Sequence, residues 1–196
     1  AKTKLASGDV LTSGALQDDI AAIKEVYERL GYIDLKLDDD VKYDAETHVA
    51  DINYVVSEGM PSRIQDVLIV GNNRTQDHVI RRELTIKPDD LADAGKIRQS
   101  KRRIENLGYF DEVNISTETT ASPALKNIRL EVSEKPTGSL SLGAGYSTED
   151  SVLGYMELTE RNFDLGKALN LERPVGGGQH FRAYVGLGAD TRNINI

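Results

Sequence analysis

The side chains that most often carry chemistry are few and scattered in this chain. The three histidines, His48, His78 and His180, have no second ligand at the helical or hairpin spacing that a zinc site needs. The chain has no cysteine, which excludes disulfides and thiolate metal sites. No nucleophile stands with a base in a pattern that supports catalysis. We therefore expect no catalytic residue, no metal, no cofactor and no enzymatic activity.

Two other patterns resemble ligand-binding loops but lack an essential part. The run from Asp38 to Asp40, with Asp44, offers calcium ligands, yet the glycine-centred loop of an EF-hand is missing. A solvated hairpin tip fits this charge run better. Gly176–Gly178 lacks the Lys-Ser/Thr pair of a phosphate-binding loop, and it predicts a turn between strands.

Basic residues gather in one short stretch. Arg98, Lys101, Arg102 and Arg103 would form a stripe along a helix. The stripe is either a solvated face or a contact for an acidic partner or lipid headgroups.

The net charge of −8 is unevenly distributed. Residues 1–61 hold 6 basic and 13 acidic side chains, residues 62–137 hold 13 and 12, and residues 138–196 hold 5 and 7. An acidic segment beside a near-neutral one argues against a nucleic-acid-binding protein.

A repeat organises the elements that position these groups. Leu30-Gly31-Tyr32 recurs 77 residues later as Leu107-Gly108-Tyr109. Each copy ends a stretch of helical periodicity, and two alternating, strand-like stretches follow it. A fixed period indicates one supersecondary unit used twice, which favours a modular scaffold over a single catalytic domain.

Polar and small residues predict where the helices begin and end. Ser13 is expected to cap a helix over residues 13–30, and Gly31 suits the left-handed position after it. Thr75 is expected to cap a short helix, and Pro88-Asp89-Asp90 is expected to open a longer one that stops at Gly108.

Alternation of apolar and polar residues predicts the strands. In the first unit they are Ile33–Leu37 and a return strand from Ala50 to Val56. In the second unit they are Asp66–Val70, residues 113–117 and residues 128–132. The second unit therefore reads β-α-α-β-β, whereas the first begins too late to include its opening strand. We define the first module as residues 1–61 and the second module as residues 62–137.

From Gly138 onward helical periodicity disappears. Leu140, Leu142, Ala144 and Tyr146 alternate with serine and glycine, and similar alternation follows around Leu158, around Asn170 between two leucines, and around Val185. This pattern is typical of transmembrane β-barrel strands, although an ordinary antiparallel sheet alternates in the same way. Residues 138–196 hold at most four strands, and a barrel needs at least about eight. The expected fold class is thus α+β: two modules followed by a fragment of a transmembrane antiparallel β-barrel.

The order and spacing of several motifs resemble the outer-membrane β-barrel assembly family, which carries POTRA (polypeptide-transport-associated) domains ahead of a barrel. The motifs are Ile69-Val70-Gly71-Asn72-Asn73-Arg74-Thr75, Ile80-Arg81-Arg82-Glu83 and Leu107-Gly108-Tyr109-Phe110 in the last POTRA domain, Gly138–Ser147 in the first barrel strand, and Glu160–Gly166 after the second. The resemblance covers essentially the whole chain. It implies the last two POTRA domains in the periplasm, the first of them incomplete, and the start of a barrel in the outer membrane.

The resemblance also implies partners. Family members insert unfolded outer-membrane proteins, and accessory periplasmic lipoproteins dock on them; Arg81, Arg82 and Glu83 are the expected docking residues. An exposed edge strand can accept an extended client through main-chain hydrogen bonds. The expected client-binding edge residues are Val113, Asn114, Ile115, Ser116, Thr117 and Glu118, with Ile33, Leu35 and Leu37 in the first module.

Two other kinds of protein share these features. One is a two-partner secretion or organelle import translocator of the same superfamily, which the number of upstream POTRA domains would distinguish. The other is a non-transport POTRA adaptor, against which the strand-rich tail argues.

Overall fold

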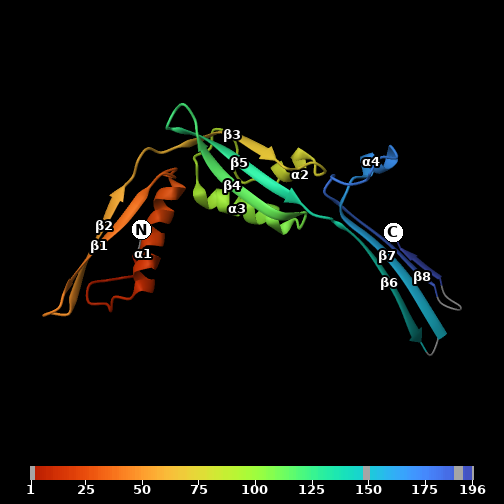
Figure 1. The fold of residues 1–196 in the computed structure, drawn as a ribbon, viewed down its shortest axis with the longest axis horizontal. Coiled ribbons are helices and arrows are strands. Elements are labelled where there is room, and N and C mark those ends of the chain that lie inside the picture. The colour runs from red at the N-terminus through yellow and green to blue at the C-terminus, as the bar shows by residue number, and fades with distance from the viewer. Residues whose placement is uncertain (1–2, 148–150, 188–191, 196) are drawn as a thin grey trace. The chain divides into compact units, whose positions relative to one another are not determined.

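The computed structural model describes residues 3–147, 151–187 and 192–195 (Figure 1). The chain forms two compact units. The first unit holds Ala1–Leu68, Thr85–Lys101 and Ile115–Leu130, and the second holds Ile69–Leu84, Arg102–Asn114 and Glu131–Ile196. The division passes through the second module, so each unit contains part of that module. The boundaries of the modules themselves stay a prediction.

The first module consists of a helix and a hairpin. Helix α1 spans Ser13–Arg29, and strands β1 (Lys36–Asp44) and β2 (Val49–Ser57) pair antiparallel. Thr12, not Ser13, is the N-cap, because its hydroxyl accepts the N–H of Ala15 at 3.2 Å. Gly31 has φ +90°, as expected for the position after a helix.

The predicted first strand of this module starts too early. Backbone hydrogen bonds from Ile33 to Gly31 and from Leu35 to Tyr32 keep the chain turning after the helix. The strand therefore begins at Lys36 and continues through the acidic stretch to Asp44. The predicted hairpin tip shortens to the turn after Asp44, whose carboxylate accepts the N–H groups of Glu46 and Thr47.

The second module contains a three-stranded sheet and two helices. The strand order is β3 (Arg63–Val70), β5 (Leu125–Glu134), β4 (Phe110–Thr119), so β3 and β4 are edge strands. The helices are α2 (Asp77–Arg81) and α3 (Ala94–Asn106). In each unit, part of α3 lies along part of this sheet (Figure 1). The strands and helices contribute these buried apolar residues: Ile64, Val67, Val79, Ile80, Ile97, Ile104, Phe110, Val113, Ile128, Leu130 and Val132.

Both predicted helix starts in this module are wrong. Asp93 precedes α3 and accepts the N–H groups of Gly95 and Lys96. The segment around Pro88 cannot start the helix, because Asp89 and Asp90 exchange backbone hydrogen bonds with Ile64 of β3. Helix α2 has no side-chain cap, since Thr75 bonds elsewhere.

The last segment is a four-stranded antiparallel sheet in the order β6 (Gly138–Ser147), β7 (Ser151–Phe163), β8 (Gln179–Leu187), β9 (Arg192–Asn195). The predicted alternation around Asn170 is not a strand: Leu165–Leu169 form the short helix α4, and Leu171 has φ +59°. Residues 148–150, 188–191 and 196 of the predicted barrel segment lie outside the described residues.

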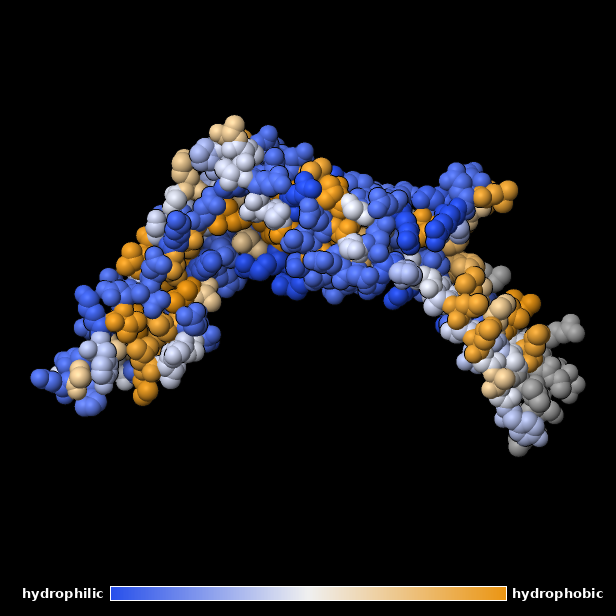
Figure 2. Space-filling model, viewed as in Figure 1, coloured by the Kyte–Doolittle hydropathy of each residue, from blue (hydrophilic) through white to orange (hydrophobic). Residues whose placement is uncertain are grey.

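The strand register gives this sheet one apolar and one polar face. Leu140 lies opposite Leu158, and Leu158 lies opposite Ala183, so these side chains share a face. On the other face Glu157 and Arg182 form an ion pair of 2.7 Å. Tyr155 and Tyr184 stack there, and the ring of Tyr155 fills the space in which Gly143 would carry a Cβ. Figure 2 shows apolar surface along these strands. In the part of the chain that the structure describes, no helix has the length and apolarity needed to cross a bilayer.

Candidate functional site

The predicted client-binding strand of the second module is an edge strand. Strand β4 has β5 on one side, and the described residues place no strand on the other. Val113 is buried and Ile115 is half-buried, whereas Asn114 and all of Ser116–Glu118 are exposed. The side chains thus hold the strand to its own domain while its outer backbone groups remain available.

The predicted edge of the first module is only partly a strand. Ile33 and Leu35 precede β1, and Leu37 alone lies within it. The edge that β1 offers is mainly Asp38–Asp44, which is acidic and exposed. Sequence alternation predicts a strand in the right region, but the predicted strand begins three residues before β1 does.

The predicted docking residues make contacts within the chain. Arg81 pairs with Asp77 at 2.6 Å, and Arg82 donates to the backbone oxygen of Gly178 at 3.3 Å. Glu83 accepts from Arg103 of the basic stripe at 3.2 Å. The side chains of Arg81 and Arg82 are 46% and 48% exposed, so both remain accessible to a partner.

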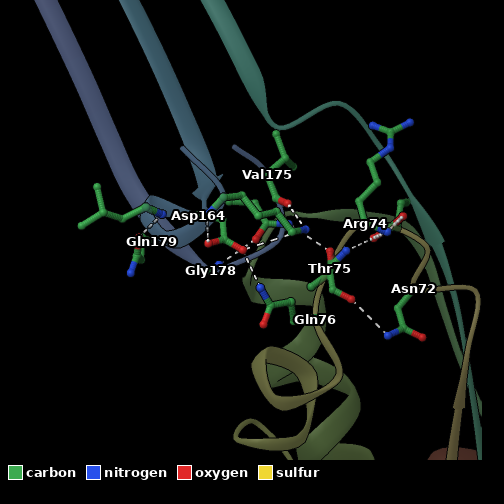
Figure 3. Close-up of polar contacts among 12 residues, drawn as sticks. Asn72, Arg74, Thr75, Gln76, Asp164, Val175, Gly178 and Gln179 are labelled. Atoms are coloured by element: carbon green, nitrogen blue, oxygen red, sulfur yellow. Dashed lines mark hydrogen bonds and ion pairs between the residues drawn. The ribbon is translucent and has the colours of Figure 1, made fainter. Parts of the chain in front are cut away.

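The loop after β3 is held by one carboxylate. Glu134 of β5 accepts the N–H of Arg74 at 2.9 Å and the N–H of Thr75 at 2.7 Å (Figure 3). Asn72 adds a bond of 3.1 Å to the carbonyl oxygen of Thr75. Two charge-assisted bonds fix the backbone of this loop, which aims Thr75 and Gln76 at the strands that follow the module.

Asn162 of β7 is the centre of this region, which we call the second junction. Its Nδ2 donates to the Thr75 hydroxyl at 2.9 Å, and its Oδ1 accepts the N–H of Gly178 at 2.8 Å. Its backbone oxygen accepts the N–H of Gly176 at 2.7 Å. Thr75 and Asn162 are each 2% exposed. The described polar contacts of this amide are therefore buried. A polar group that lost its partner at such a position would be costly, because water could not replace the partner.

The glycine triplet allows close backbone approach at the second junction. A Cβ on Gly176, which has φ +118°, would lie 2.0 Å from the carbonyl oxygen of Arg74. A Cβ on Gly177 would lie 2.8 Å from the oxygen of Phe163. The predicted turn between strands is present, and it also packs against the loop of the module; the N–H of Gln76 donates to Gly176 at 2.9 Å.

Two more residues complete the second junction. Asp164 is 6% exposed, caps α4 through the N–H of Lys167, and accepts from the side chain of Gln76 (Figure 3). The Tyr109 hydroxyl donates to the backbone oxygen of Arg161 at 2.8 Å, and burial raises the pKa of this phenol. The set consists of hydrogen-bond donors and acceptors, which suits rigid attachment of the loop to the strands.

A first junction lies at the other copy of the Leu-Gly-Tyr turn. The N–H of Ser62 donates to Gly31 at 2.9 Å. Arg98 pairs with Glu28 at 2.8 Å, and the buried Lys126 pairs with Asp34 at 2.6 Å. The acidic partner of Arg98 is thus in the same chain. Among the described residues, no group of three or more His, Asp or Glu side chains could hold a metal ion.

Comparisons with known proteins agree with this architecture. The POTRA family model, described as a surface antigen variable number repeat, matches residues 1–59 and again residues 62–135. The outer membrane protein assembly factor BamA of Neorickettsia risticii is 34% identical over 161 residues, which cover 82% of this chain and 22% of that protein. BamA of Neisseria meningitidis is 31% identical over 160 residues, covering 79% and 20%. The chain spans about a fifth of the length of these relatives, which are named as assembly factors.

Solved structures show the same fold. The crystal structure of BamA from Haemophilus ducreyi lacking POTRA domains 1–3 matches with a TM-score of 0.82, covering 97% of this chain and 34% of that chain at 23% identity. The POTRA3–5 region of Haemophilus influenzae BamA matches with a TM-score of 0.61 at 20% identity, covering 66% and 52%. The α+β fold class, with POTRA units and the start of a barrel, is confirmed.

Proposed function

The chain belongs to the POTRA family, and we propose that it is the membrane-proximal POTRA region and the first barrel strands of an outer-membrane protein assembly factor. The POTRA modules lie in the periplasm and the strands from Gly138 lie in the outer membrane. The observation that carries the proposal is that two POTRA matches lead directly into an antiparallel sheet with one apolar face. The chain binds and positions clients, without enzymatic activity and without binding nucleic acid.

The proposed clients are unfolded outer-membrane proteins, and the proposed receptor is the outer edge of β4, Val113–Glu118. An extended client adds as a strand beside β4, and each net backbone hydrogen bond contributes about 0.5–1.5 kcal/mol. Backbone pairing accepts many sequences, which suits a machine with many clients. Strand β1 offers a second edge of the same kind, with Leu37 in it.

The second junction connects the start of strand β4 to strand β7 of the barrel segment. Tyr109, which bonds β7, immediately precedes β4. A client segment held along the start of β4 is therefore attached to a backbone that is fixed to β7. This arrangement delivers captured strands to one position beside the growing sheet. The Arg81–Glu83 surface remains the proposed docking site for an accessory periplasmic lipoprotein.

The test uses proline at neighbouring positions of β4. Adjacent residues of a strand direct their N–H groups to opposite sides, so of Asn114→Pro and Ile115→Pro one removes a bond to β5 and the other removes an outward donor. We expect one variant to lose stability in a circular-dichroism melt. The other should stay folded but lose binding of an extended barrel-derived peptide, measured by fluorescence anisotropy.

The control is Asn114→Ala, which removes a side chain and keeps the backbone donor. It should leave affinity within about threefold, below about 1 kcal/mol. Normal peptide binding by the proline variant that stays folded would contradict the proposal, and clients would then be held elsewhere on the chain.

A further inference from the structure

The connection between β7 and β8 carries an unusual set of exposed leucines. Leu165, Leu169 and Leu171 are 52%, 77% and 96% exposed. They lie on α4 and in the turn that follows it, and Figure 2 shows the apolar surface at the outer end of this helix. Leu171 also has φ +59°, a backbone conformation that leucine rarely adopts. An exposed apolar cluster of this kind usually marks an interaction site.

The leucines are exposed on a segment that is firmly tied to the fold. Asp164 caps α4, and the N–H of Leu171 bonds to Ala168 at 3.2 Å. The Lys167 ammonium donates to the carbonyl oxygen of Val175 at 2.8 Å, which closes the base of the connection. The exposed leucines therefore extend from a segment with fixed hydrogen bonds.

The same connection borders the apolar face of the strands. A cavity of about 450 Å³ is lined by Pro174 and Val175 of the connection together with Leu140, Leu158 and Phe181. The last three share the apolar face, which in a barrel of this family faces lipid. The connection thus lies on the lipid side, at the end of the strands that is nearest to the second module.

The charges close to the leucines suit a membrane surface. Arg173 is exposed and follows Leu169 and Leu171 in the sequence, with Glu172 as the one acidic residue between Leu165 and Arg173. The Lys167 ammonium is bonded to Val175 and lies 3.9 Å from Asp164, so Arg173 is the cation placed to reach headgroups. Basic side chains can extend to headgroups while adjacent apolar groups enter the acyl boundary, at a depth of about 5–10 Å.

We propose that the β7–β8 connection is a membrane-surface anchor, in which Leu165, Leu169 and Leu171 insert into the interfacial layer of the bilayer leaflet at the module end of the strands. The partner is phospholipid, whose acyl groups contact the leucines and whose headgroups lie next to Arg173. The anchor would fix the height of the second junction relative to the membrane surface.

The test places a fluorophore at Leu171 in this chain reconstituted into phosphatidylcholine vesicles. The chain has no cysteine, so Leu171→Cys provides its single labelling site for an environment-sensitive dye. We expect a blue-shifted emission and loss of intensity when the lipids carry nitroxide groups on their acyl chains. The loss should be greatest with nitroxides placed near the headgroup.

Two further variants calibrate this result. Leu142→Cys, on the apolar face of β6, should be quenched most strongly by nitroxides deep in the acyl region. Leu30→Cys, in the first module and 54% exposed, should show no quenching by lipid. A dye at Leu171 that behaves like the one at Leu30 overturns the anchor. A blue-shifted dye at Leu171 without nitroxide quenching also overturns it, because the leucines would then meet protein.

Discussion

The two copies of the Leu-Gly-Tyr turn lie at two junctions that are built from different chemistry. At the first junction the side chains are ionic, with Arg98 against Glu28 and Lys126 against Asp34. At the second junction the central side chain is the buried, neutral amide of Asn162, which bonds one hydroxyl and one backbone N–H, while the backbone oxygen of the same residue accepts a second N–H. An exposed ion pair such as that of Arg98 weakens with salt, whereas a buried amide that is bonded on both sides requires one geometry. The same motif thus lies beside ion pairs at the first junction and beside a buried amide at the second.

The largest expected effect is at the glycine triplet. Gly176→Ala should destabilise the protein by roughly 2–5 kcal/mol, because the new Cβ would clash with the backbone of Arg74 and the residue has a positive φ. Urea unfolding followed by circular dichroism measures the change. The control is Gly14→Ala in α1, where space is open and alanine favours the helix. Equal stability of the two variants would mean that the second junction is not tightly packed.

Removing the central amide tests whether the second junction is a network. Asn162→Leu leaves the Thr75 hydroxyl and the Gly178 N–H without their partner, and it should cost roughly 2–4 kcal/mol. Thr75→Val should cost less, and the double variant should cost less than the sum of the two. Strict additivity in this cycle would show that the two side chains act independently. Asn114→Ala, on the exposed strand β4, should change stability by less than about 0.5 kcal/mol.

The Tyr109 hydroxyl makes the second junction sensitive to alkaline pH. Burial raises the pKa of Tyr109 above its ordinary value of 10.0, so the unfolded chain ionises this phenol first. The stabilisation is complete below about pH 10 and is lost as the pH rises through the folded-state pKa. Tyr109→Phe should cost about 1 kcal/mol at neutral pH and should reduce the alkaline loss.

The control for this pH effect is Tyr54→Phe in the first module. Burial also raises the pKa of Tyr54, so its removal should reduce a separate part of the alkaline loss. The measurement is the free energy of unfolding by denaturant, taken for each variant from neutral pH to pH values above 10.0. The difference between each variant and the wild type gives the contribution of that tyrosine to the alkaline loss. If Tyr109→Phe lost stability at alkaline pH as the wild type does, the ionisation of Tyr109 would not contribute to that loss.

The smallest effect is expected at the first junction. The Arg98 side chain is 53% exposed, so Arg98→Ala should cost about 0.2–1 kcal/mol at low salt and almost nothing at about 1 M salt, where the screening length is about 3 Å. The cost of Asn162→Leu should be the same in both conditions. A salt-independent Arg98→Ala effect would contradict the expected contrast between the exposed ion pair at the first junction and the buried amide at the second.

Local features were predictable from the sequence, and long-range partners were not. The repeat, both positive-φ glycines of the Leu-Gly-Tyr turns and the strand-rich tail follow from spacing and residue type. Residue type predicts Thr75 as a helix cap, because threonine commonly caps helices, but its hydroxyl is bonded to Asn162, 87 residues away. The prediction for Pro88–Asp90 failed for a related reason, since β3 pairs with that segment. The glycine triplet predicts a turn, yet nothing in the local sequence indicates that the turn packs against Arg74.

The composition of the β4 edge has a consequence for how copies of this protein meet one another. Asp111, Glu112 and Glu118 are exposed on that strand. Two copies that approached edge to edge would bring like charges together, which disfavours pairing. If β4 receives clients as proposed above, a client strand with fewer carboxylates should meet less repulsion there than a second copy of β4 would. Sedimentation of the chain should accordingly reveal more self-association at high salt than at low salt, and the opposite trend would refute this charge-based exclusion.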